Sequence, residues 1–76
     1  MPLITTITPS WSAAVTLTTA EVWQARSRVF VTTEASPTQW SGLEMLPGDA
    51  IAFEAGEVVR HRSPETGAQI FRMPVL

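Results

Sequence analysis

The chain has 76 residues, the size of one small domain. It has no cysteine and one histidine, which excludes disulfides, thiolate chemistry and any site built from several imidazoles. Five arginines, no lysine and seven carboxylates give a net charge of −2, which argues against a protein that holds nucleic acid through a basic patch.

The N-terminal residues 1–10 carry no charge and predict an extended arm. Leu3, Ile4 and Ile7 alternate weakly with threonines, which favour β-structure. The arm is therefore expected to form an edge strand or to lend a strand to a partner. It contains neither a basic segment nor a long apolar core, and no apolar run in the chain approaches the ~20 residues that span a bilayer. Neither a signal peptide nor a membrane association is expected.

Residues 13–18 and 28–33 alternate with the period of strands. Val29 and Val31 are expected to face inward, with Arg28, Phe30 and Thr32 on the opposite face. No stretch sustains the 3.6-residue period of a helix. Short runs between regular turn signals therefore indicate β-structure throughout.

The C-terminal half has the clearest turn signals. Pro47-Gly48 suits the two central positions of a type II turn, because proline presets φ and glycine supplies a positive φ. Ile51 and Phe53 then alternate on one face of a strand over 50–54. Ala55-Gly56 is expected to close a hairpin with a left-handed glycine, and strands over 57–62 and 68–73 to complete an antiparallel meander.

The expected fold is all-β, a small antiparallel β-sandwich or barrel of six to eight short strands. The extended N-terminal arm covers residues 1–10, and one domain covers residues 11–76. Such a short chain buries a small core, and its low charge favours a protein that works bound to a partner.

No catalytic constellation is evident. His61 lies between Arg60 and Arg62 without a nucleophile or metal-ligand spacing, and we interpret it as a surface or interface histidine. Glu44, Asp49, Glu54 and Glu57 cluster around two turns, where they are expected to be solvated charges that protect sheet edges. The sequence predicts no enzyme, cofactor, metal or small-molecule substrate.

The tryptophans are the candidate contact residues. Trp23 is expected in the core, whereas Trp40 lies in a Ser/Pro-rich segment and either caps the core or contacts a partner. The predicted partner interface joins residues of the arm, two tryptophans and two arginines: Leu3, Ile4, Ile7, Trp11, Trp40, Arg60 and Arg62.

One resemblance concerns the Leu46-Pro47-Gly48-Asp49 turn followed by residues 50–59. This stretch resembles the swapped-hairpin antitoxins and transition-state regulators, in which a basic N-terminal segment reads DNA. Residues 3–18 contain no basic residue, so the part that would bind DNA is missing here. A DNA-binding regulator is kept as an alternative function, and a small ligand-binding β-domain as another.

A second resemblance covers nearly the whole chain. The Thr-rich start, the Val29–Ala35 strand that runs into a Ser/Pro loop, the 42–49 stretch and the 55–60 turn are similar to small proteins encoded with tailed-phage head genes. This resemblance implies a non-enzymatic virion protein that binds the outside of a capsid as a decoration or cement protein. Its expected partners are the major capsid protein and copies of itself, without nucleic acid. Its expected location is the virion, assembled in the bacterial host cytoplasm.

Overall fold

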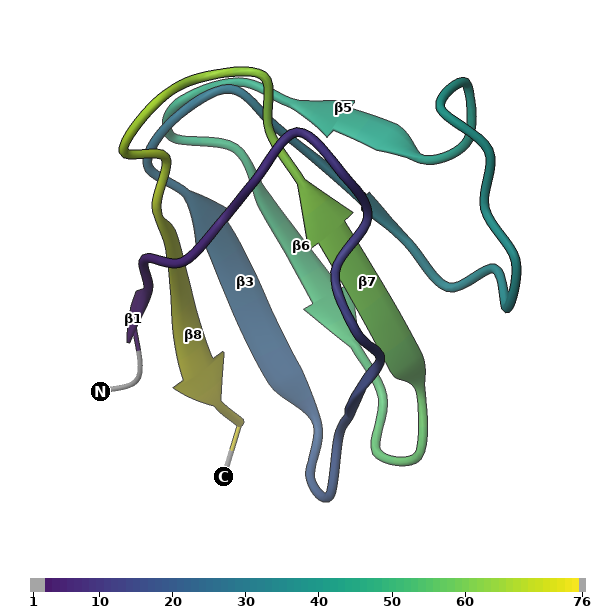
Figure 1. Cartoon of the computed structure of the whole chain (residues 1–76). Helices are drawn as coiled ribbons and strands as arrows, with labels where there is room; N and C mark the ends of the chain where they lie inside the picture. Colours follow the sequence, from purple (N-terminus) through teal and green to yellow (C-terminus); the bar gives the residue numbers. More distant parts are fainter. Residues whose placement is uncertain (1–2, 76) are drawn as a thin grey trace.

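A computed structural model describes residues 3–75, which form eight strands in two four-stranded antiparallel sheets (Figure 1). The first sheet has the order β1-β8-β3-β6 and the second has the order β2-β7-β4-β5. The predicted small antiparallel sandwich is confirmed. The described residues contain no helix that is long and apolar enough to cross a membrane. The strands are β1 (Leu3–Ile4), β2 (Val15–Thr16), β3 (Glu21–Ala25), β4 (Val29–Thr32), β5 (Leu43–Met45), β6 (Ala50–Phe53), β7 (Val58–Arg62) and β8 (Ile70–Pro74).

The predicted C-terminal meander is wrong, because the last three strands alternate between the sheets. β6 and β8 both pair with β3 in the first sheet, whereas β7 pairs with β2 and β4 in the second. The turn at Ala55-Gly56 is therefore an arch between the sheets and not a hairpin. Gly56 has the expected positive φ of 90°, and its N–H donates to the carbonyl oxygen of Leu17 at 2.8 Å. The turn is thus pinned to the segment that follows β2.

The N-terminal segment lies along the domain. β1 pairs with β8 and forms an edge of the first sheet. The chain then crosses to the second sheet, where the Ser63 N–H donates to the Thr8 carbonyl oxygen at 2.9 Å. Ile7, between these two points, is buried in the core. Residues 3–10 are thus seated on the sandwich as an edge strand and a crossover, while residues 1, 2 and 76 of the predicted arm and domain lie outside the described residues.

The core lies between the two sheets and follows the expected alternation. Trp23, Val29, Val31 and Phe53 all face inward. The rings of Trp23 and Phe53 meet edge to face, with centroids 5.3 Å apart. The buried apolar residues come from both sheets and their connections: Ile7, Leu17, Trp23, Ala25, Val29, Val31, Met45, Phe53, Val59, Ala68 and Ile70.

Two similar turns bracket β6. The Asp49 N–H donates to the Leu46 carbonyl oxygen at 2.9 Å, and Gly48 has a φ of 96°, as the predicted type II turn requires. The Asp49 carboxylate also accepts the Leu46 N–H at 2.9 Å. At the other end, the Glu57 carboxylate accepts the Glu54 N–H at 2.7 Å. A carboxylate thus closes the turn at each end of β6.

A charged cluster lies on the inner face of the first sheet. The Glu21 carboxylate accepts hydrogen bonds from Nε and a terminal nitrogen of Arg72, both at 2.8 Å, and from the Trp23 indole at 3.0 Å. The Arg72 guanidinium also lies 5.2 Å from the Trp23 ring. The hydrogen bond from Arg72 holds the pKa of Glu21 below its ordinary value, although burial opposes this. The two charges are tolerated between the sheets because each satisfies the other.

His61 is buried in the core, so its interpretation as a surface histidine is wrong. Its ring centroid lies 6.3 Å from that of Trp23, and its Nδ1 has no hydrogen-bond partner among residues 3–75. Burial, helped by the positive charge of Arg72, lowers the pKa of His61. The imidazole is therefore neutral in the folded domain near neutral pH.

This burial predicts a loss of stability on mild acidification. Below about pH 6.5, the unfolded chain protonates His61 before the folded domain does, so the free energy of unfolding falls with pH by at most about 1.4 kcal/mol per unit. Glu21, whose pKa is also lowered on folding, adds a second loss that begins below about pH 4.5. Urea unfolding between about pH 8 and 3 measures both. His61→Gln should remove the slope between about pH 6.5 and 5; an unchanged slope would contradict the role of His61.

Candidate functional site

The connection between β4 and β5 displays a tryptophan on a braced turn. The Ser41 N–H donates to the Thr38 carbonyl oxygen at 3.1 Å, and the Thr38 N–H donates to Ser41 Oγ at 3.0 Å. The Trp40 N–H donates to Thr38 Oγ1 at 3.3 Å. Trp40 itself is 86% exposed, so it does not cap the core. The alternative in which Trp40 caps the core is therefore wrong.

Trp11 anchors the base of this turn. Its indole N–H donates to the Thr38 carbonyl oxygen at 2.6 Å. A Cβ on Gly42 would lie 2.7 Å from the Trp11 ring and 2.8 Å from the Val31 carbonyl oxygen, and Gly42 also has a φ of 98°. Only glycine fits there without displacing the indole. The packing of Trp11 on Gly42 therefore ties the N-terminal segment to the turn that carries Trp40.

Arg62 of β7 joins three parts of the chain at this place. Its terminal nitrogens donate to the carbonyl oxygens of Pro9, at 3.3 Å, and Gln39, at 2.8 Å. Its guanidinium lies 4.6 Å from the Phe30 ring and 5.4 Å from the Trp11 ring. Arg62 and Phe30 sit opposite each other on neighbouring strands, which places the cation over the ring.

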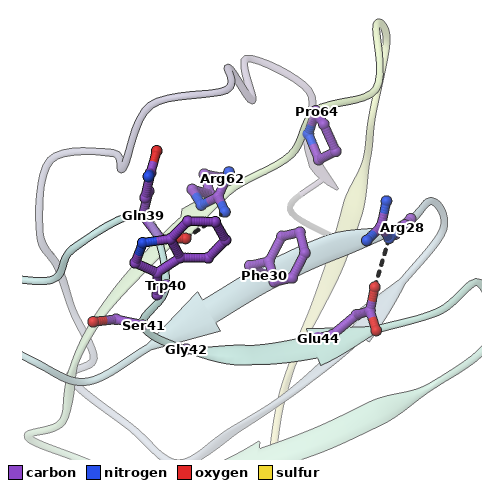
Figure 2. Close-up of a pocket in the computed structure, with 9 residues that line it drawn as sticks. All are labelled: Arg28, Phe30, Gln39, Trp40, Ser41, Gly42, Glu44, Arg62 and Pro64. Atoms are coloured by element: carbon purple, nitrogen blue, oxygen red, sulfur yellow. Dashed lines mark hydrogen bonds and ion pairs between the residues drawn. The ribbon is translucent and has the colours of Figure 1, made fainter.

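Phe30, Gln39 and Arg62 border an open hollow of about 470 Å³ on the outer face of the second sheet (Figure 2). Arg28 and Glu44 flank it with an ion pair at 2.6 Å, and the Arg28 guanidinium lies 5.3 Å from the Phe30 ring. Both charged side chains are about half exposed. We call this region the Trp40 surface; it is lined by Arg28, Phe30, Gln39, Trp40, Ser41, Gly42, Glu44, Arg62 and Pro64.

The structure brings together part of the interface predicted from sequence. Trp40 and Arg62 line the hollow, and Trp11 packs beneath it. Arg60 points to the same outer face and donates to the Ser12 carbonyl oxygen at 3.2 Å.

The three aliphatic residues of the predicted interface lie elsewhere. Leu3 and Ile4 form β1 at the edge of the first sheet, with Leu3 exposed and Ile4 half-buried. Ile7 is buried in the core and is not available to a partner. The predicted interface is therefore not one continuous patch.

Sequence reasoning missed Phe30, Arg28, Glu44 and Pro64 as members of the surface. The alternation of β4 already placed Arg28 and Phe30 on the outward face, and an outward aromatic residue on a short strand was the available signal. Glu44 and Pro64 come from other parts of the chain. Their proximity to Phe30 depends on the β4–β5 register and on the loop that follows β7.

The Trp40 surface combines aromatic, charged and backbone groups. It presents aromatic faces and a half-exposed ion pair, and its central guanidinium is held by backbone carbonyl oxygens. Within residues 3–75, no three His, Cys, Asp or Glu side chains lie together so as to hold a metal ion.

Comparisons with known proteins add no relative. A scan against protein-family models, a search of curated proteins and a search of solved structures each returned no match.

Proposed function

We propose that the protein is a non-enzymatic structural protein that docks onto a large protein assembly through the Trp40 surface. The assembly proposed is the outside of a phage capsid, where many copies bridge coat subunits. Any protein that binds only the assembled shell stabilises it by mass action. The resemblance to phage head proteins supports this choice of partner, and the exposed Trp40 is the observation that carries the docking role.

Trp40 has the properties of a binding anchor. Tryptophan is strongly enriched among the few residues that dominate interface energies, where its ring enters a pocket of the partner. Here the ring is 86% exposed on a turn that is already held by Thr38 and Ser41. Docking would therefore order little additional backbone, which removes part of the entropy cost of association.

The arginines of this face favour a protein partner over nucleic acid. Arg60 and Arg62 donate to backbone carbonyl oxygens, and Arg28 is paired with Glu44. Binding to phosphates requires cations that are free to release counterions. These guanidinium groups are instead engaged within the domain, where they hold the turn and the N-terminal segment. The aromatic surface is therefore left to contact a partner.

The experiment that tests this proposal is quantitative mass spectrometry of purified virions from a host that carries the gene. We expect the protein to copurify with the coat protein in a fixed ratio and to rebind shells from which it has been removed. Its absence from the particles, or binding to bare DNA with no affinity for shells, would refute the proposal.

Trp40→Ala should weaken binding to undecorated shells by about 30-fold, the effect of losing a central interface anchor. Its melting temperature should stay near that of the wild type, because an exposed side chain contributes little to stability. Val58→Ala is the matched control, since Val58 is an exposed apolar residue of β7 outside the hollow. Sedimentation measures the occupancy of both variants. Equal occupancy would show that Trp40 is not the anchor.

A small ligand-binding β-domain is the second candidate, and it is supported by the hollow itself. Its volume of about 470 Å³ lies within the range of small-molecule sites. Trp40 and Phe30 would supply flat apolar faces, with Arg28 and Glu44 as polar partners at the rim. Titration with soluble sugars and nucleotides, followed by amide chemical shifts, tests it. Shifts around Trp40 without any binding to shells would favour this candidate.

A further inference from the structure

The strand β6 is an open edge of the first sheet. It pairs with β3 on one side, and no described strand pairs with its other side. Alternate residues of an edge strand direct their N–H and C=O groups away from the neighbouring strand. The sequence of β6, Ala-Ile-Ala-Phe, contains none of the charges or prolines that usually block such an edge. β6 therefore offers backbone hydrogen bonds to an added strand.

An apolar groove opens beside this edge. Its volume is about 290 Å³, and it lies between the two sheets, where β5 and β6 form the edges on the same side of the sandwich. Ile51 and Phe53 of β6 line one wall, while Val31 and Leu43 line the other. Side chains of a strand added to β6 would alternate between this groove and solvent. The groove therefore selects a segment whose alternate residues are apolar.

Carboxylates flank β6 in the chain, and one lines the groove. Asp49 comes directly before β6, Glu54 comes directly after it, and Glu34 lines the groove. The ion pairs among residues 3–75 are Arg28–Glu44 and Arg72–Glu21, so none of these three carboxylates is neutralised by a described cation. No arginine lines the groove. The edge thus carries negative charge at both ends.

The same charges oppose pairing with a second copy. If two β6 strands met antiparallel, Glu54 of one copy would lie near the start of β6, and so near Asp49, in the other. Like charges placed opposite each other destabilise a strand pair. The flanking carboxylates therefore protect an apolar edge from self-association while leaving it attractive to a cationic segment.

We propose that the β6 edge and its groove bind an extended protein segment in which apolar residues alternate with polar ones and lysine or arginine lies at both ends. Strand addition supplies main-chain hydrogen bonds. The groove binds the alternate apolar side chains, and the carboxylates attract the cationic ends of the segment. This site adjoins the Trp40 surface at Gly42, which lines both hollows, but the two share no other lining residue, and it would provide a second contact with a partner.

A short acetylated peptide of alternating valine and threonine, with lysines at both ends, is the probe. Fluorescence anisotropy of the labelled peptide gives its affinity, and amide chemical shifts locate its site. We expect binding at least about tenfold tighter than that of the same peptide with glutamates at both ends, with the largest shifts at Ala50–Phe53. The difference should shrink at 1 M salt, where the screening length is about 3 Å. A proline at the centre of the peptide should abolish binding.

Two protein variants test the groove and the charges separately. Leu43→Ala removes part of the groove wall, and Leu46→Ala is its control, because the two leucines are 54% and 52% exposed and only Leu43 lines the groove. We expect Leu43→Ala alone to weaken the peptide by about fivefold, the effect of removing a partly buried aliphatic side chain. Glu34→Gln combined with Glu54→Gln should produce a similar loss at low salt only.

Trp40→Ala serves as the variant that separates the two sites. It should bind the lysine peptide as the wild type does, even if the capsid proposal fails. Equal affinity for the lysine and glutamate peptides, shifts confined to the Trp40 surface, or equal effects of Leu43→Ala and Leu46→Ala would each overturn the β6 proposal. Formation of a dimer through β6 in the absence of peptide would overturn it as well.

Discussion

Phe53→Ala is expected to unfold the domain or nearly so. Phe53 is buried on β6, and its ring meets Trp23, the largest fully buried side chain, edge to face at 5.3 Å. Truncation of a buried phenylalanine costs about 3–5 kcal/mol, through lost burial and the cavity left behind. A core of this size rarely supplies more than about 3–5 kcal/mol in total. The substitution therefore removes a large share of the free energy of unfolding.

Urea unfolding followed by tryptophan fluorescence measures this effect, because Trp23 reports on the core. Phe53→Leu, which keeps most of the apolar volume, should remain folded with a smaller loss. Leu46→Ala, at an exposed leucine in the preceding turn, should change stability by no more than about 0.5 kcal/mol. A Phe53→Ala variant that unfolds at the same urea concentration as the wild type would show that the inner face of β6 contributes little to the stability of the core.

Glu21→Ala should destabilise the domain by about 3 kcal/mol. The substitution leaves the Arg72 guanidinium without its carboxylate and the Trp23 indole without its acceptor, between the sheets. The side chains of Arg72 and Glu21 are only 22% and 12% exposed, so water replaces the lost bonds poorly. The lower end of the usual range is expected because Arg72 keeps this limited access to solvent.

The second ion pair among residues 3–75 is the matched control. Arg28 and Glu44 meet at 2.6 Å, but their side chains are 47% and 45% exposed. Glu44→Ala should therefore cost no more than about 1 kcal/mol. The double variant Glu21→Leu with Arg72→Met should be more stable than Glu21→Ala, because no unpaired charge remains buried. Equal losses for Glu21→Ala and Glu44→Ala in urea unfolding at pH 7 would contradict the role given to the buried pair.

The two proposed contact regions adjoin each other at Gly42, which lines both hollows. The Trp40 surface lies on the outer face of the second sheet, where Trp11, Arg62 and Gly42 hold the β4–β5 connection. The β6 edge belongs to the first sheet. Trp40 lines only the first hollow and Leu43 only the groove beside β6, so variants at these two residues test the proposals independently.

The candidate site was only partly predictable from the sequence. Trp40 stood out as a tryptophan in a Ser/Pro-rich segment, but the sequence left open whether it caps the core or contacts a partner. Phe30 was expected on the outer face of its strand, but nothing local indicated that Arg62 would lie opposite it. That pairing follows from the β4–β7 register, which joins segments about thirty residues apart in the chain.

The burial of His61 could have been predicted from the alternation of side chains along β7. Val59 and His61 are two residues apart on β7 and therefore share a face, and Val59 is buried. His61 was interpreted as a surface or interface histidine because no nucleophile or metal-ligand spacing accompanies it, and the alternation of the strand was not applied to it. The alternation was the better guide, because side-chain direction in a strand depends on the backbone and not on the polarity of the neighbours.

The all-β class, the inward faces of β4 and β6, and the turn at Pro47-Gly48 could be predicted from the sequence alone. These features depend on period-two alternation and on the φ preferences of proline and glycine, which act over a few residues. Only the tertiary structure decided that the Ala55-Gly56 turn is an arch, that the N-terminal segment spans both sheets, and that Glu21 meets Arg72. The physical reason is that the same turn residues can join strands within a sheet or between sheets. The choice is made by long-range packing, which buries every apolar face at once.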